Sequence, residues 1–187
     1  MISFTDLNID GDDIYWVERR PEQEGQYVVV KCSTDKQVRD ITPNGWSART
    51  IIYSYGGGAF TVSNGTIYFS NYDTVNFPKT NDQRLFRQAQ GKVPKPLTSL
   101  VAMRYGDPVI HNDRLICVRE DHTVKKDGHP IVTLVAIPHD GETEEKVLVS
   151  GSDFYSSPCL SPDGRKDNRW LIKSMNTNST ALELLGM

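Results

Sequence analysis

A polar stretch in the second half of the chain holds the residue types that most readily do chemistry. Glu120, Asp121, His122 and His129 combine carboxylates with imidazoles, which are ligand types of zinc sites. They lie on the glycine-containing segment Glu120 to Pro130, with no second ligand pair at a fixed offset. The spacing therefore favours a solvated loop over a metal site, with a substrate-facing or interdomain role as the alternative.

Three consecutive glycines, Gly56, Gly57 and Gly58, are a second candidate because glycine-rich loops can cradle phosphates. A nucleotide-binding loop needs the N-terminus of a helix directly after its glycines. Here the glycines run into Ala59–Val62, whose residues predict a strand. We interpret the glycines as a close backbone approach or a bulge at the start of that strand, and we expect no cofactor.

Four arginines, Arg49, Arg84, Arg104 and Arg119, recur at the ends of strand-like runs. A guanidinium group is planar and carries several donors, so it can satisfy carbonyls and carboxylates between neighbouring sheets. This structural role is favoured over capture of a substrate carboxylate.

The sequence contains no nucleophile motif of the G-x-S-x-G kind. Gly151 and Ser152 are followed by Asp153 and Phe154, which breaks the pattern. We therefore expect no catalytic residue in this chain.

The composition of the chain argues against several classes of binding partner. The 187 residues carry a net charge of −3 with lysine and arginine scattered, so nucleic acid is not expected. No run approaches the ~18 apolar residues of a membrane span, and no secretory pattern follows Met1. Three widely spaced cysteines, Cys32, Cys117 and Cys159, suit a reducing compartment, and we expect a cytoplasmic protein.

A repeat organises the chain. Four polar turn-forming segments are each followed by an apolar, aromatic-rich run, and these runs begin about 50 residues apart, at Ile14, Ile67, Leu115 and Trp170. The turn-forming segments are Asp10–Asp13, Ser63–Thr66, His111–Arg114 and Ser161–Gly164. A period of ~40 to 50 residues with several short strands is typical of β-propeller blades.

The repeat predicts an all-β fold, a partial and open β-propeller of about three to four four-stranded antiparallel blades. The predicted boundaries are a propeller over residues 1–172, with blades at roughly 1–45, 46–102, 103–152 and an incomplete 153–172, and a non-matching tail at 173–187. Within the tail, Ala181–Leu185 has no β-branched residue and predicts a helix.

Several segments in succession make the sequence similar to a known family. They are Tyr55–Val62, Asp82–Gln88, Arg114–His122, Asp153–Pro158 and Leu160–Gly164. Together they resemble the N-terminal propeller of the prolyl oligopeptidase family, and within it the branch of dipeptidyl aminopeptidases and acylaminoacyl peptidases. The resemblance covers residues 3 to 166.

The resemblance implies a function for the parent enzyme. Members of the family are serine peptidases in which the propeller caps a C-terminal α/β-hydrolase domain that holds the catalytic residues. The chain would then be the non-catalytic, substrate-gating portion, with the hydrolase domain as its partner and peptides as the parent's substrate. The family-motif residues, structural or channel-facing, would be Arg49, Tyr55, Gly56, Gly57, Gly58, Arg84, Arg119, Glu120, Asp121 and His122.

The sequence also departs from the family. Tyr53 and Ser54 stand where a histidine and a glutamate usually precede the tyrosine and glycines, and the family pattern stops after Lys166. Family members also begin earlier, so we expect truncation at both ends, either of the gene or through an altered reading frame. The alternative is a stand-alone interaction module that uses its open blade edges to recruit a partner. Self-association through the open blade edges is a further expectation.

Overall fold

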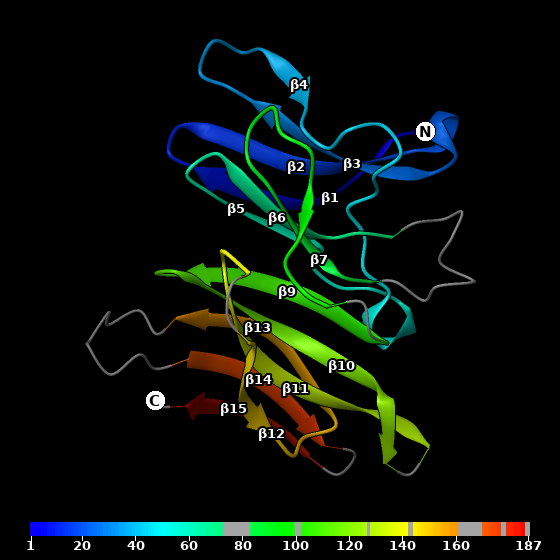
Figure 1. Cartoon of the computed structure of the whole chain (residues 1–187), viewed down its shortest axis with the longest axis vertical. Coiled ribbons are helices and arrows are strands. Elements are labelled where there is room, and N and C mark those ends of the chain that lie inside the picture. Colours follow the sequence, from blue (N-terminus) through cyan, green and yellow to red (C-terminus); the bar gives the residue numbers. More distant parts are fainter. Residues whose placement is uncertain are drawn as a thin grey trace.

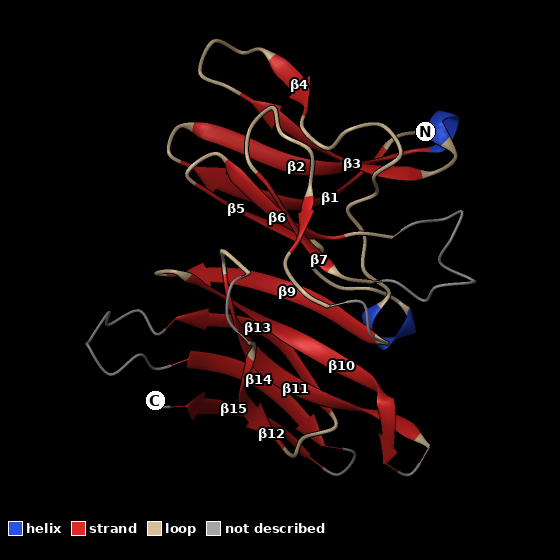
Figure 2. Cartoon of the chain, viewed as in Figure 1, coloured by secondary structure: helices blue, strands red, loops and turns tan. Residues whose placement is uncertain are grey.

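The computed structural model describes residues 1–72, 83–99, 102–126, 128–141, 144–160, 170–176 and 179–185, and side chains as far as Cys159. It consists of four antiparallel sheets that follow one another along the chain, which we number blades 1 to 4 (Figure 1). Within the described residues, three sheets have four strands and the fourth has three. Almost all of the regular structure is strand, with two short 3-10 turns (Figure 2).

The strands of each blade pair in chain order. Blade 1 holds β1 (Ser3–Asp10), β2 (Asp13–Arg20), β3 (Gln26–Cys32) and β4 (Val38–Asp40), with the turn η1 (Pro21–Gln23) between β2 and β3. Blade 2 holds β5 (Phe60–Ser63), β6 (Thr66–Ser70), β7 (Leu85–Gln88) and β8 (Lys95–Pro96), and η2 (Ile52–Ser54) precedes it. Blade 3 holds β9 (Met103–His111), β10 (Arg114–Lys126), β11 (His129–Pro138) and β12 (Lys146–Ser150). Blade 4 holds β13 (Phe154–Leu160), β14 (Trp170–Asn176) and β15 (Ser179–Leu185).

The predicted all-β fold of antiparallel four-stranded sheets is confirmed, and it is consistent with a partial propeller. The first strands of the blades adjoin one another: β1 contacts β5, β5 contacts β9, and β9 contacts β13. We call these four the inner strands. No helix in the described part of the chain has the length and apolar character needed to span a bilayer.

Three sequence expectations need correction. The polar segment Glu120 to Pro130 is not a loop, because β10 and β11 extend through it as a hairpin with a bulge between Asp121 and Lys125. The predicted helix at Ala181–Leu185 is wrong, since these residues pair with β14 as part of β15. The strand β1 was not predicted. The turn expected at Ser161–Gly164 lies outside the described residues.

Side chains that alternate along the strands fill the space between blades. In β10, Leu115 and Cys117 belong to the cluster shared with blade 2, whereas Ile116 and Val118 belong to the cluster shared with blade 4. All four are at most 2% exposed. Successive residues of a strand point to opposite faces, so this continuous apolar run supplies two cores at once.

Aspartate side chains join the blades at the inner strands. Asp107 lies at a bulge of β9 with φ of 51°, and its two carboxylate oxygens accept the Gly58 N–H at 2.6 Å and the Ser157 N–H at 2.9 Å. Asp6 lies at the equivalent bulge of β1 and accepts the Ala59 N–H at 3.0 Å. One carboxylate in blade 3 therefore binds backbone of both neighbouring blades.

We predict that Asp107→Ala lowers the free energy of unfolding by about 2 kcal/mol, because two N–H groups lose a charged acceptor. Asp107→Asn should cost less, since an amide oxygen still accepts one bond and asparagine tolerates the left-handed backbone. Urea denaturation measures both. The control Asp113→Ala removes an exposed carboxylate and should change stability by less than about 0.5 kcal/mol; an equal loss in Asp107→Ala and Asp113→Ala would contradict the prediction.

Candidate functional site

The segment that carries the glycine motif crosses from blade 1 to the inner strand of blade 2 through a tight turn. Tyr53 and Ser54 in η2 have φ of 56° and 68°, in the left-handed region that non-glycine residues rarely adopt. Ile52 anchors the turn with 1% exposure, and the Gly56 N–H donates to the Ile52 carbonyl at 2.9 Å. Such strain persists only where surrounding contacts fix the backbone.

A buried carboxylate from blade 3 holds this turn. Glu120 is 3% exposed, and its Oε1 accepts the Tyr53 N–H at 2.9 Å. Its Oε2 lies 3.0 Å from His122 Nε2 and 3.7 Å from Arg104 Nη1. Arg104 also donates to the Ile51 carbonyl at 3.3 Å. The carboxylate is thus bonded in three directions, which makes it a positioning group rather than a free acid or base.

The Tyr53 side chain spans to blade 4. Its hydroxyl donates to the Tyr155 carbonyl at 2.7 Å and accepts the Tyr155 N–H at 3.0 Å. Burial is the main cause that raises the pKa of the Tyr53 hydroxyl, and the nearby Glu120 carboxylate adds to the shift. The Tyr53 hydroxyl therefore binds both backbone polar groups of Tyr155 and links the turn to blade 4.

The glycines are required by close packing against Asp107. A Cβ at either Gly57 or Gly58 would lie 3.0 Å from Asp107 Oδ1. Gly56 has a φ of 101°, a conformation that favours glycine. On the neighbouring inner strand, burial raises the pKa of Asp6, and the charge of Asp107 acts in the same direction. Two carboxylates thus lie near the glycine segment.

An aromatic group is displayed beside this polar network. Tyr53 stacks on Tyr55 with ring centroids 5.9 Å apart, and Phe154 contacts Tyr53 at 5.2 Å. Tyr55 is 79% exposed and Phe154 is 39% exposed. The site thus combines exposed aromatic side chains with a buried carboxylate that is already hydrogen-bonded.

The structure brings together only part of the predicted set. Tyr55, the three glycines, Glu120 and His122 lie in the one network just described. The other four make separate local contacts: Arg49 lies over the Tyr27 and Tyr72 rings, Arg84 over Phe86, Arg119 pairs with Glu145, and Asp121 accepts from Thr123. Within the described ranges no group of three or more His, Cys, Asp or Glu side chains is placed to hold a metal ion.

Several residues of the network were absent from the predicted set, among them Asp107 and Tyr53. Asp107 had one local signal, since it follows a glycine and precedes Pro108, a combination typical of a break in regular strand. Tyr53 was noted only as a departure from the family motif, and its role depends on a blade 102 residues further along the chain.

Of the comparisons with known proteins, the one with solved structures found matches. No protein-family profile matches the sequence, and no curated protein matches it. Among solved structures, puromycin hydrolase superposes with a TM-score of 0.82 at 25% identity, over 98% of this chain and 30% of that chain. The fold is that of a partial β-propeller. These structural neighbours belong to the prolyl oligopeptidase family, and the match falls on their propeller portion.

A second relative supports the likeness. A puromycin-hydrolysing peptidase of Mycobacterium tuberculosis has a TM-score of 0.71 and 28% identity, over 99% of this chain and 30% of that chain. The chain therefore spans about a third of the length of the structures that it matches.

We predict that Tyr53→Phe costs about 1–2 kcal/mol at pH 7, because both hydroxyl bonds to Tyr155 are lost. The cost should shrink with rising pH. An unfolded tyrosine ionises near pH ~10, whereas native Tyr53 keeps its proton to higher pH, so the stability from this group is present below pH ~10 and is lost above it.

Urea denaturation at pH 7 and near pH ~10.5 measures the effect. The control Tyr55→Phe removes an exposed hydroxyl and should leave the stability unchanged at both pH values. A cost for Tyr53→Phe that stays constant across this pH range would contradict the prediction.

Proposed function

We propose that this chain is the propeller portion of a serine peptidase of the prolyl oligopeptidase family, in the branch of dipeptidyl aminopeptidases and acylaminoacyl peptidases. The supporting observation is the superposition on puromycin hydrolase at a TM-score of 0.82 over 98% of the chain. The cysteines Cys32, Cys117 and Cys159, none of which forms a disulfide, fit the reducing cytoplasm, where we place the protein.

Its role in this proposal is to restrict access. Inner strands that adjoin side by side surround a common axis, and the width there limits what reaches a hydrolase domain. Asp6 and Asp107 give these inner strands negative charge, and the Tyr53, Tyr55 and Phe154 rings offer apolar contact. Peptides would pass, and folded proteins would be excluded by size.

The proposal is tested with a chimera in which these 187 residues replace the matching portion of puromycin hydrolase. We expect the folded chimera to hydrolyse puromycin and to leave folded ubiquitin intact. The 187-residue chain alone should neither release product from aminoacyl substrates nor react with a fluorophosphonate. Turnover by the chain alone, or a folded chimera that digests ubiquitin, would refute the proposal.

The exposed face of blade 1 favours a second candidate, an interaction module. Leu7 pairs with Trp16 and Ile9 with Ile14, on the face that points away from the core shared with blade 2. Phe4, Leu7 and Ile9 are each at least 67% exposed, and Ile14 is 42% exposed. A contiguous apolar face of this kind marks an interaction surface.

The two candidates differ in their behaviour in solution. If the chain is a propeller portion, it should self-associate at micromolar concentration, and Leu7→Lys with Ile9→Lys should restore a monomer, because both lysines lie on the exposed face. Size-exclusion chromatography with light scattering measures the mass. A wild-type chain that stays monomeric at ~100 µM would favour the stand-alone module.

A further inference from the structure

A groove opens between the outer parts of blades 1 and 2. It measures about 900 Å³ and is lined by the η1 turn, by β3, by the segment after β4, and by β7 with the turn that follows it. The groove contains none of the network around Tyr53 and Glu120, so the function proposed above does not use it.

A buried amide with an unused acceptor lines this groove. Gln88, the last residue of β7, is 3% exposed, and its Nε2 donates to the Ile41 carbonyl at 2.7 Å. Its Oε1 has no hydrogen-bond partner among the described residues. A buried carbonyl left without a donor costs free energy, so a ligand that brings an N–H to it gains on binding.

The rim of the groove is mainly acidic. Glu22, Glu24 and Asp40 line it, and Lys92 is the one cationic residue among the lining residues. Glu22 and Glu24 have no ion-pair partner within the described part of the chain. Free carboxylates near an unpaired acceptor make the groove complementary to a cation that carries several N–H donors.

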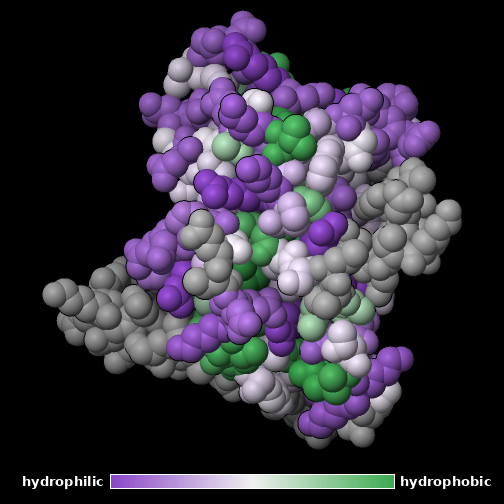
Figure 3. All heavy atoms as spheres, in the orientation of Figure 1, coloured by the Kyte–Doolittle hydropathy of each residue, from purple (hydrophilic) through white to green (hydrophobic). Residues whose placement is uncertain are grey.

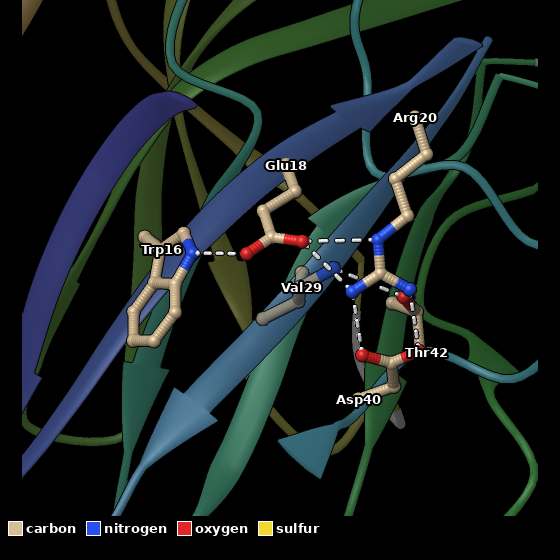
Figure 4. Close-up of polar contacts among 6 residues, drawn as sticks. All are labelled: Trp16, Glu18, Arg20, Val29, Asp40 and Thr42. Carbon is tan, nitrogen blue, oxygen red and sulfur yellow. Dashed lines mark hydrogen bonds and ion pairs between the residues drawn. The ribbon is translucent and has the colours of Figure 1, made fainter. Parts of the chain in front are cut away.

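The chain itself shows how a guanidinium is held at this rim. Arg20 donates to Glu18 Oε2 at 2.8 Å and to both oxygens of Asp40 at 2.6 and 2.7 Å (Figure 4). The hydroxyl oxygen of Thr42, which is drawn near Asp40 in the same view, accepts the Val29 N–H at 3.0 Å. Asp40 is thus already neutralised, and Glu22 and Glu24 supply the charge still available to a ligand.

We propose that this groove binds an arginine side chain presented by a peptide segment of a partner protein. The aliphatic part of the side chain would lie along Val28, Ile41 and Val93, of which Val93 is 72% exposed and offers apolar surface. The planar guanidinium has five donors in a fixed fork, enough to reach Gln88 Oε1 together with Glu22 or Glu24. A lysine ammonium is a compact point charge, so it is less suited to bind Gln88 Oε1 and a glutamate carboxylate at the same time.

The test uses the 187-residue chain and a fluorescein-labelled alanine-rich peptide that contains two arginines, with fluorescence anisotropy as the readout. Citrulline and lysine versions of the peptide should bind at least ~5-fold more weakly. The double variant Glu22→Gln with Glu24→Gln should weaken binding ~5- to 10-fold, and Lys92→Glu should strengthen it ~3-fold or more. Amide NMR shifts should concentrate on residues 22–28, 40–44 and 88–93.

The matched control is Asp12→Asn with Asp113→Asn, which removes two exposed carboxylates outside the groove and should leave the affinity unchanged. A loss of affinity in this control equal to that of the Glu22 and Glu24 variant would show nonspecific charge attraction and overturn the proposal. Equal binding of the citrulline peptide, or no gain with Lys92→Glu, would overturn it as well. Gln88→Met, checked for an unchanged fold, should weaken arginine binding and leave the already weak citrulline binding as it was.

Discussion

The contact between blades depends on side-chain carboxylates that bind backbone N–H groups of the neighbouring sheet. Each inner strand is an edge strand that pairs on one side only, and the inner strands of adjacent blades belong to separate sheets in the described part of the chain. Asp107 bridges this gap in two directions, to Gly58 and Ser157. In blade 1, Asp10 does the same for the β5–β6 turn, where its oxygens accept the Asn64 and Gly65 N–H groups at 3.1 and 2.6 Å.

These polar contacts set the register in which the apolar faces meet. The space-filling view shows apolar residues in separate groups within a predominantly polar surface (Figure 3). The hydrophobic effect is not directional, so it would by itself allow the sheets to slide over one another. Short bonds from an aspartate to a defined N–H restrict such sliding. The left-handed backbone at Asp107 and Tyr53 is the conformational cost of placing these groups.

The sequence predicted the strands that are rich in β-branched and aromatic residues, such as those that begin at Ile67 and Leu115, because their local pattern agrees with the fold. It did not predict β1, in which a bulge at Asp6 shifts the alternation between Phe4 and Leu7. The prediction of a helix at Ala181–Leu185 was wrong, because pairing with β14 overrides the local helix propensity of these residues.

The candidate site was predicted only as far as local spacing allowed. Glu120 and His122 were singled out for their chemistry, and they do contact each other. The partners that give Glu120 its role, Tyr53 and Arg104, come from other strands and turns, 67 residues away in the case of Tyr53. Such pairings are a product of tertiary structure, and no periodicity in the chain encodes them.

The double use of β10 has a consequence for how the molecule comes apart. Because neighbouring residues of this one strand are shared between the interfaces on either side of blade 3, loosening it would remove support from both at the same moment. Blades 2 to 4 should then melt as one cooperative unit, whereas β4, whose three residues are all exposed, can detach on its own. Strand β10 therefore supports the interfaces on both sides of blade 3.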